Sequence, residues 1–130
     1  MWETSELGGE ELPWAATVFN GGIAGQQQAP CGAMSASAVF LGLRHRCPLE
    51  DKEKAEQARE SARKEAGELA KGFIDKFGTL TCRELIGLDF SQPEQYRQFR
   101  EARMWEEKCD HYVQFVIERL YELEGKRSTA

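Results

Sequence analysis

The residues best suited to chemistry in this sequence are four cysteines, Cys31, Cys47, Cys82 and Cys109. No two of them form the C-x-x-C pair of thioredoxin-type or zinc sites, and no C-x-x-C-H haem motif occurs. A thiolate can bind a metal, attack a disulfide or exchange electrons. The chemistry open to this chain is therefore that of separate thiols, which the fold has to bring together.

Two of these thiols stand where a helix should begin. Cys31 follows an aperiodic, glycine-rich loop at 21–30, and Cys82 follows Thr81, the first residue of a capping-box pattern. Backbone amides at a helix start carry about half a positive charge and stabilise a thiolate. Arg83 adds a full positive charge beside Cys82. We therefore expect both thiols to have lowered pKa values.

The elements that must position the cysteines are all predicted to be helical. Apolar residues recur at steps of three and four, and no segment shows the alternation of a strand. We expect an all-α fold, a helical bundle with one long central helix and a Gly-rich loop, in a single domain whose first ten residues are mobile. The predicted helices cover residues 14–19, 32–46, 49–77, a short segment from Cys82, and 94–123 with a break near Arg103.

Helix geometry decides which cysteines can meet. Cys31 and Cys47 lie at opposite ends of one predicted helix, roughly 24 Å apart at about 1.5 Å per residue. A disulfide requires Cα atoms within about 7 Å, so these two cannot share a site. The long helix carries Cys82 back toward Cys31, and Cys109, predicted to lie within the last helix on its apolar face, can reach the same end. The expected cluster is Cys31, Cys82 and Cys109.

The composition of the chain limits which kinds of partner we expect it to have. The 130 residues include 17 basic and 22 acidic side chains, for a net charge of -5, without a basic stripe, so nucleic acid is not expected as a partner. No apolar run reaches the roughly 20 residues of a membrane span, and no secretory signal is visible, so we expect a cytoplasmic protein without membrane insertion. The long helix has a face lined only by alanines in its first half, which favours a homodimer that covers it.

Three stretches carry a resemblance to a known family. They are "FNGGIAG", "CGAMSASAVFLGL" and "FIDKFGTLTCRELIGLD", followed by a late cysteine. In this order they resemble the redox-active family named for its C_GCAxxG_C_C cysteine pattern. Position by position, the family's cysteines correspond to Cys31, Cys82 and Cys109. The final glycine of the motif is Ala36 here. The family's first cysteine lies in a helix before the Gly-rich loop, and the chain begins too late to contain it, so either the sequence is truncated or this member has lost one thiol.

The resemblance implies redox chemistry of one of two kinds. The three thiols either exchange with disulfides, with an unknown redox partner protein, or hold an iron–sulfur cluster, as is thought for multihaem cytochromes that resemble the family. A complete cluster would require a fourth ligand from elsewhere. His111 projects away from Cys109 around the helix, so we expect it at the surface instead. The candidate catalytic and metal-binding residues are Cys31, Cys82 and Cys109, and the candidate cofactor contacts are Gly32, Ala33 and Arg83.

The alternative is a non-catalytic helical interaction protein. Free cysteine is among the most buried residue types and often serves as a small apolar side chain. In this interpretation the cysteines are packing residues. In either interpretation we expect the aromatic residues in the core, namely Trp14, Trp105, Tyr112, Phe115 and Tyr121. The absence of a C-x-x-C pair favours this alternative, and the thiols at helix starts favour redox chemistry.

Overall fold

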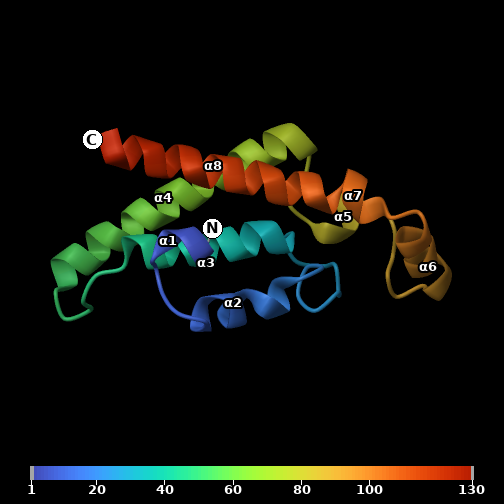
Figure 1. Cartoon of the computed structure of the whole chain (residues 1–130), viewed down its shortest axis with the longest axis horizontal. Helices are drawn as coiled ribbons and strands as arrows, with labels where there is room; N and C mark the ends of the chain where they lie inside the picture. Colours follow the sequence, from blue (N-terminus) through green and yellow to red (C-terminus); the bar gives the residue numbers. More distant parts are fainter. Residues whose placement is uncertain (1, 130) are drawn as a thin grey trace.

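The computed structural model describes residues 2–129, and their regular structure is helical (Figure 1). The predicted all-α class is confirmed. Within this range the one extended pairing is an isolated antiparallel bridge between Pro30 and Thr81. The elements are α1 (Trp2–Ser5), α2 (Glu11–Ala16), the 3₁₀ helix η1 (Thr17–Phe19), α3 (Gly32–His45), α4 (Lys52–Phe77), α5 (Cys82–Ile86), α6 (Pro93–Glu101), α7 (Met104–Glu107) and α8 (Cys109–Thr129).

The core lies where α3, α4 and α8 meet, and α2 runs along the outer side of α3 (Figure 1). Phe73 on α4 is fully buried, and its ring packs edge-on against Phe115 of α8 at 5.8 Å between centroids. Tyr112 and Phe77 complete this aromatic cluster. Such ring pairs contribute about 0.5–1.5 kcal/mol each beyond their buried area. The cluster fixes the start of α8 against the end of α4.

Local signals set the ends of α4. The side chain of Asp51 accepts a hydrogen bond from the Lys54 amide (3.1 Å), which satisfies one of the first free amides of the helix. Gly78 ends the helix at φ +91°, a left-handed conformation that glycine adopts without a steric penalty. α4 packs against α3, and Ala55 is almost fully buried, whereas the other alanines of this face are half-buried. The alanine face is thus partly covered within the chain, and the homodimer stays a prediction.

An ion-pair cluster joins the end of the bundle opposite to Cys31. The imidazole Nε2 of His45, the last residue of α3, lies 2.7 Å from a carboxylate oxygen of Glu65 on α4. Arg127 of α8 pairs with the same carboxylate. Arg44 in turn lies 2.7 Å from Glu124. These half-buried pairs connect α3, α4 and α8 at this end of the bundle. At the other end, the aromatic cluster connects α4 and α8.

The predicted final helix is interrupted twice. The break predicted near Arg103 is present, since this residue has a left-handed φ of +50°. A second interruption at Lys108 was not predicted, and it makes Cys109 the first residue of α8 rather than a residue within a longer helix. The reason is tertiary. The Lys108 ammonium and the Tyr112 hydroxyl both donate to the carbonyl of Leu85 on α5, each at 3.1 Å.

The N-terminal part of the chain adds α1 and α2. The predicted mobility of the first ten residues includes Met1, which lies outside the described residues, and for the rest it stays a prediction. Two aromatic residues predicted to be core are exposed instead, Trp14 on α2 at 74% and Tyr121 on α8 at 50%. Among the helices of residues 2–129, none combines the length and the apolar character needed to cross a membrane.

The start of α3 lies unusually close to η1. A Cβ atom on Gly32 would lie 2.6 Å from the carbonyl oxygen of Phe19, which is closer than real Cβ contacts. Gly42, further along the same helix, has no atom within 4 Å of the equivalent position. Gly32 is therefore required by the close approach of η1 to the start of α3, directly after Cys31. No such approach occurs at Gly42, where a side chain would meet open space.

Alanine substitutions should separate these two glycines. We expect Gly32→Ala to lower the free energy of unfolding by about 1–3 kcal/mol, because the new methyl group forces α3 and η1 apart. Gly42→Ala, the matched control, should raise it by roughly 0.5–1 kcal/mol, because glycine is unfavourable within a helix. Urea denaturation followed by circular dichroism measures both. Equal effects of the two substitutions would contradict this account of Gly32.

Candidate functional site

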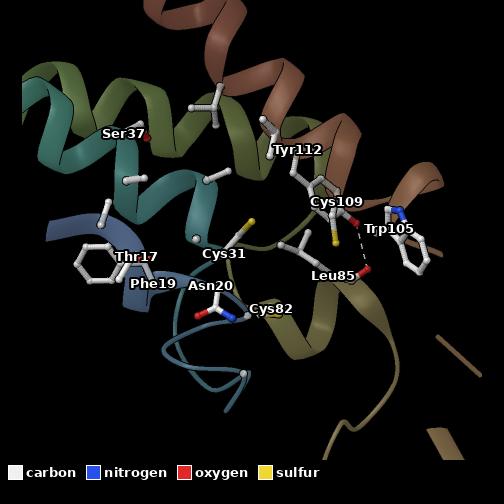
Figure 2. Close-up of a pocket in the computed structure, with 18 of the residues that line it drawn as sticks. Thr17, Phe19, Asn20, Cys31, Ser37, Cys82, Leu85, Trp105, Cys109 and Tyr112 are labelled. Atoms are coloured by element: carbon white, nitrogen blue, oxygen red, sulfur yellow. Dashed lines mark hydrogen bonds between the residues drawn. The ribbon is translucent and has the colours of Figure 1, made fainter. Parts of the chain in front are cut away.

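Three cysteines line one cleft of about 770 Å³ (Figure 2). Each of them begins a helix. Cys31 is the N-cap residue of α3, Cys82 the first residue of α5 and Cys109 the first residue of α8. Cys47 follows the far end of α3 and does not line the cleft. All four thiols are free in the structure.

Two backbone hydrogen bonds hold the segments around Cys31 and Cys82 together. The amide of Cys31 donates to the carbonyl of Leu80 (2.7 Å), and the amide of Cys82 donates to that of Ala29 (3.2 Å). The bonds flank the isolated antiparallel bridge, so the side chains of Cys31 and Cys82 project from the same face as diagonal neighbours. Diagonal neighbours in such a pair lie about 7–8 Å apart. This spacing is close to the limit for a disulfide, which is about 7 Å between Cα atoms.

The loop before Cys31 also caps α5. Thr81 directly precedes the helix, as predicted, but the predicted capping by its side chain is wrong, because that side chain makes no capping hydrogen bond. The first amides of the helix, those of Cys82 and Arg83, donate instead to the carbonyls of Ala29 and Gln27, the latter at 3.0 Å. The carbonyls of residues 27 and 29, distant in the chain, therefore cap α5 in place of the Thr81 side chain. The positive ends of these amides are consequently already engaged by oxygen.

Gln27 is the fully buried anchor of this loop. Its backbone amide donates to the carbonyl of Gly21 (2.8 Å). Its side-chain nitrogen donates to the carbonyl of Leu88 (3.0 Å), and its side-chain oxygen accepts from the amide of Phe90 (2.7 Å). A buried amide must satisfy its donors and acceptors inside the protein, and this one does so across the turn after α5. The loop is therefore fixed to that turn.

Gly22 allows the loop to pass next to Cys82. Its φ is +62°, and a Cβ atom there would lie 2.7 Å from the carbonyl oxygen of Ala29 and 3.1 Å from Cβ of Cys82. Both the conformation and the space exclude other residues. Gly22 thus permits close packing of the loop against Cys82.

The predicted lowering of the Cys31 pKa is wrong in sign. The amides of Ala33 and Met34 do act on this sulfur as expected of a helix start, and they favour the thiolate. Burial opposes them and is the larger effect, so the pKa of the Cys31 thiol is raised. A charge is costly to remove from water, and two amide dipoles do not compensate for it here.

The same correction applies to Cys82. Burial raises the pKa of its thiol, and the nearby thiolate of Cys31 raises it further. The side chain of Gln27 and the charge of Arg83 lower it, but by less. Arg83 is otherwise engaged, since its guanidinium lies 3.0 Å from the carboxylate of Asp89. The thiol is therefore kept protonated at neutral pH.

Cys109 is the least acidic of the three thiols. Burial raises its pKa, the thiolates of Cys31 and Cys82 raise it further, and the resulting pKa is about 11. The hydroxyl of Tyr112 responds in the same way, since burial and then the charges of the same three sulfurs raise its pKa. These mutual effects mean that the cleft holds three thiols close enough to oppose one another's ionisation.

The donor set does not fit a metal centre as it stands. Among residues 2–129, no group of three or more histidine, cysteine, aspartate or glutamate side chains is arranged to hold a metal ion. His111 is exposed, as predicted, and does not line the cleft. A cluster held by Cys31, Cys82 and Cys109 would therefore require these side chains to rearrange, in addition to a fourth ligand.

The predicted cofactor contacts fall into two groups. Gly32 and Ala33 line the cleft beside Cys31, whereas Arg83 does not line it. Sequence reasoning did not identify the aromatic part of the lining, because these residues come from helices whose packing no local pattern predicts. Trp105 was predicted only as a core residue. The aromatic lining residues are Phe19, Phe40, Phe90, Tyr96, Phe99, Trp105 and Tyr112.

Comparisons with known proteins bear on the family. Searches of curated proteins and of solved structures returned no match. The model of the family described as "Putative redox-active protein (C_GCAxxG_C_C)" matches residues 3–123, which includes the three cysteines of the cleft. Because this match spans nearly the whole chain, the protein belongs to the C_GCAxxG_C_C family of redox-active proteins.

Proposed function

We propose that the protein works by reversible disulfide formation between Cys31 and Cys82. The observation that carries this proposal is the backbone pairing that makes the two residues diagonal neighbours on one face. Both line the same cleft, and their thiols interact electrostatically. In the oxidation, two S–H bonds break and one S–S bond forms, with two electrons and two protons passing to a substrate.

Exposure assigns different roles to the two thiols. Cys31 is partly exposed and Cys82 is buried, so a substrate in the cleft meets Cys31 first. Cys31 is then the attacking thiol, and Cys82 closes the disulfide and releases the reduced product. Cys109, with a pKa of about 11, keeps its proton at neutral pH and stays a thiol. The thiolate and not the thiol is the nucleophile. Because their pKa values are raised, the cleft thiols should react slowly with thiol reagents dissolved in the solvent.

Closing the disulfide requires a small backbone movement, and the loop before Cys31 is suited to it. Ile23 and Ala24 have positive φ values of 66° and 47°, which cost non-glycine residues about 1–3 kcal/mol each. Both residues are exposed. The strain at these two exposed residues lowers the cost of changing their conformation, while Gln27 keeps the rest of the loop fixed to the turn after α5. This supports a disulfide whose formation shifts the loop.

Mild oxidation tests the pairing directly. With diamide as oxidant, we expect an intramolecular disulfide between Cys31 and Cys82. Trypsin separates all four cysteines, into peptides 1–44, 47–52, 77–83 and 109–119, so mass spectrometry of the digest identifies the linkage. Cys31→Ser and Cys82→Ser should each abolish the linked peptide, and Cys47→Ser, the matched control, should leave it unchanged. A digest without linked peptides would instead favour structural cysteines in an interaction protein.

Alkylation rates test the protonation states. A pKa of about 11 for Cys109, against 9.0 for a free thiol, makes its thiolate about 100-fold rarer at neutral pH. We therefore expect iodoacetamide to label Cys109 last, and all three cleft thiols more slowly than in the protein unfolded in guanidinium. The rates should rise with pH until each thiol is ionised. Labelling of Cys31 or Cys82 faster in the folded than in the unfolded protein would contradict the account of burial given above.

The iron–sulfur alternative predicted from the family resemblance has its own test. Protein purified without oxygen and analysed for iron, sulfide and visible absorption should carry no stoichiometric cluster if the dithiol mechanism is right. A cluster that is lost in the Cys31→Ser, Cys82→Ser and Cys109→Ser variants but kept in Cys47→Ser would establish cluster binding instead.

A further inference from the structure

Of the residues that the structure describes, 2–129, none with a charged side chain lines the cleft that holds the three thiols. This is unexpected on composition alone, because 30% of the residues of the chain are charged. The walls are apolar and aromatic, with Phe90 and Phe99 in contact at 4.8 Å and Phe99 next to Trp105 at 6.0 Å between ring centroids. A volume of about 770 Å³ falls within the range of small-molecule sites, about 300–1,000 Å³.

The missing charges exclude classes of ligand. Nucleotides, phosphorylated flavins and glutathione are anions, and the cleft offers them no arginine, lysine or histidine. An uncharged ring compound, in contrast, matches aromatic walls that can stack against it. Polar groups are few. Asn20 and Thr17 lie at the edge formed by η1 and the following loop, and Figure 2 draws Asn20 on the same side of the cleft as Cys31 and Cys82.

We propose that the cleft binds an uncharged aromatic two-electron acceptor of the quinone class, which the dithiol of Cys31 and Cys82 reduces. This inference rests on the proposed function and names its substrate class. In the reaction the two S–H bonds break, the S–S bond forms, and two electrons and two protons pass to the quinone, whose two carbonyl oxygens become the hydroxyls of a hydroquinone. Asn20 lines the cleft, and its side-chain amide supplies a donor that such an oxygen could accept from.

Duroquinone is the appropriate probe. All its ring positions carry methyl groups, so no stable thioether product can form, and any adduct with Cys31 is resolved by Cys82 with net oxidation and reduction. We expect calorimetric titration to show binding of duroquinone to the reduced protein, and anaerobic mixing to yield hydroquinone together with the Cys31–Cys82 disulfide. Anthraquinone sulfonate, which carries a fixed negative charge, should bind far more weakly. The Cys31→Ser, Cys82→Ser double variant should still bind duroquinone but form no hydroquinone.

A matched pair of charge substitutions locates the site. Val113 lines the cleft on α8 and is 45% exposed, so Val113→Asp should fold and yet weaken duroquinone binding by at least about tenfold, because it places a carboxylate beside an apolar ligand. Gln114→Asp adds the same charge at the next position, which is exposed and outside the cleft, and should leave binding unchanged. Circular dichroism checks that both variants fold.

The outcomes separate this inference from the function on which it rests. Absence of duroquinone binding, equal binding by Val113→Asp, or binding without hydroquinone formation would overturn the quinone proposal, while a diamide-induced Cys31–Cys82 disulfide would leave the dithiol function standing. If a second copy of the chain covers the cleft instead, sedimentation should show a dimer that Val113→Asp dissociates, and duroquinone should not bind. That result would also overturn the proposal.

Discussion

The site depends on one short stretch of backbone pairing between two segments far apart in the chain. The hydrogen bonds between Cys31 and Leu80 and between Cys82 and Ala29 bring two helix starts side by side. Without them, α3 and α5 would each present a lone thiol. Backbone amides in the interior need hydrogen-bond acceptors. The same pairing therefore also caps the start of α5, a role that the sequence predicted for the side chain of Thr81. One set of bonds thus builds the fold and the site together.

The electrostatics of the thiols follow from a competition between burial and dipoles. At Cys31 the amides of α3 favour the thiolate, and at Cys82 the charge of Arg83 does so, yet burial is stronger in both places. The thiols also raise one another's pKa values, since a second negative charge is harder to form beside a first. Such thiols stay protonated at neutral pH, which is consistent with the proposal that electrons and protons leave together.

Local patterns in the sequence predicted the helical class, the break at Arg103 and the family, because periodicity, backbone-breaking residues and motif order are local properties. They did not predict the interruption at Lys108, which depends on the carbonyl of Leu85 on another helix. Nor did they predict the pKa values, because a helix start can be recognised from a few residues whereas burial depends on the whole chain. The uncharged lining of the cleft, assembled from separate helices, could not be predicted for the same reason.

Gln27 has a consequence for how the cleft responds to its own thiols. Its backbone carbonyl accepts a hydrogen bond from the amide of Arg83, and its side-chain oxygen accepts one from the amide of Phe90, a residue that lines the cleft. If Cys31 and Cys82 form the proposed disulfide and the Cys31 segment shifts, Gln27 is the side chain that links this movement to Phe90. The proposed redox step would then alter the wall of the cavity as well as its sulfur atoms.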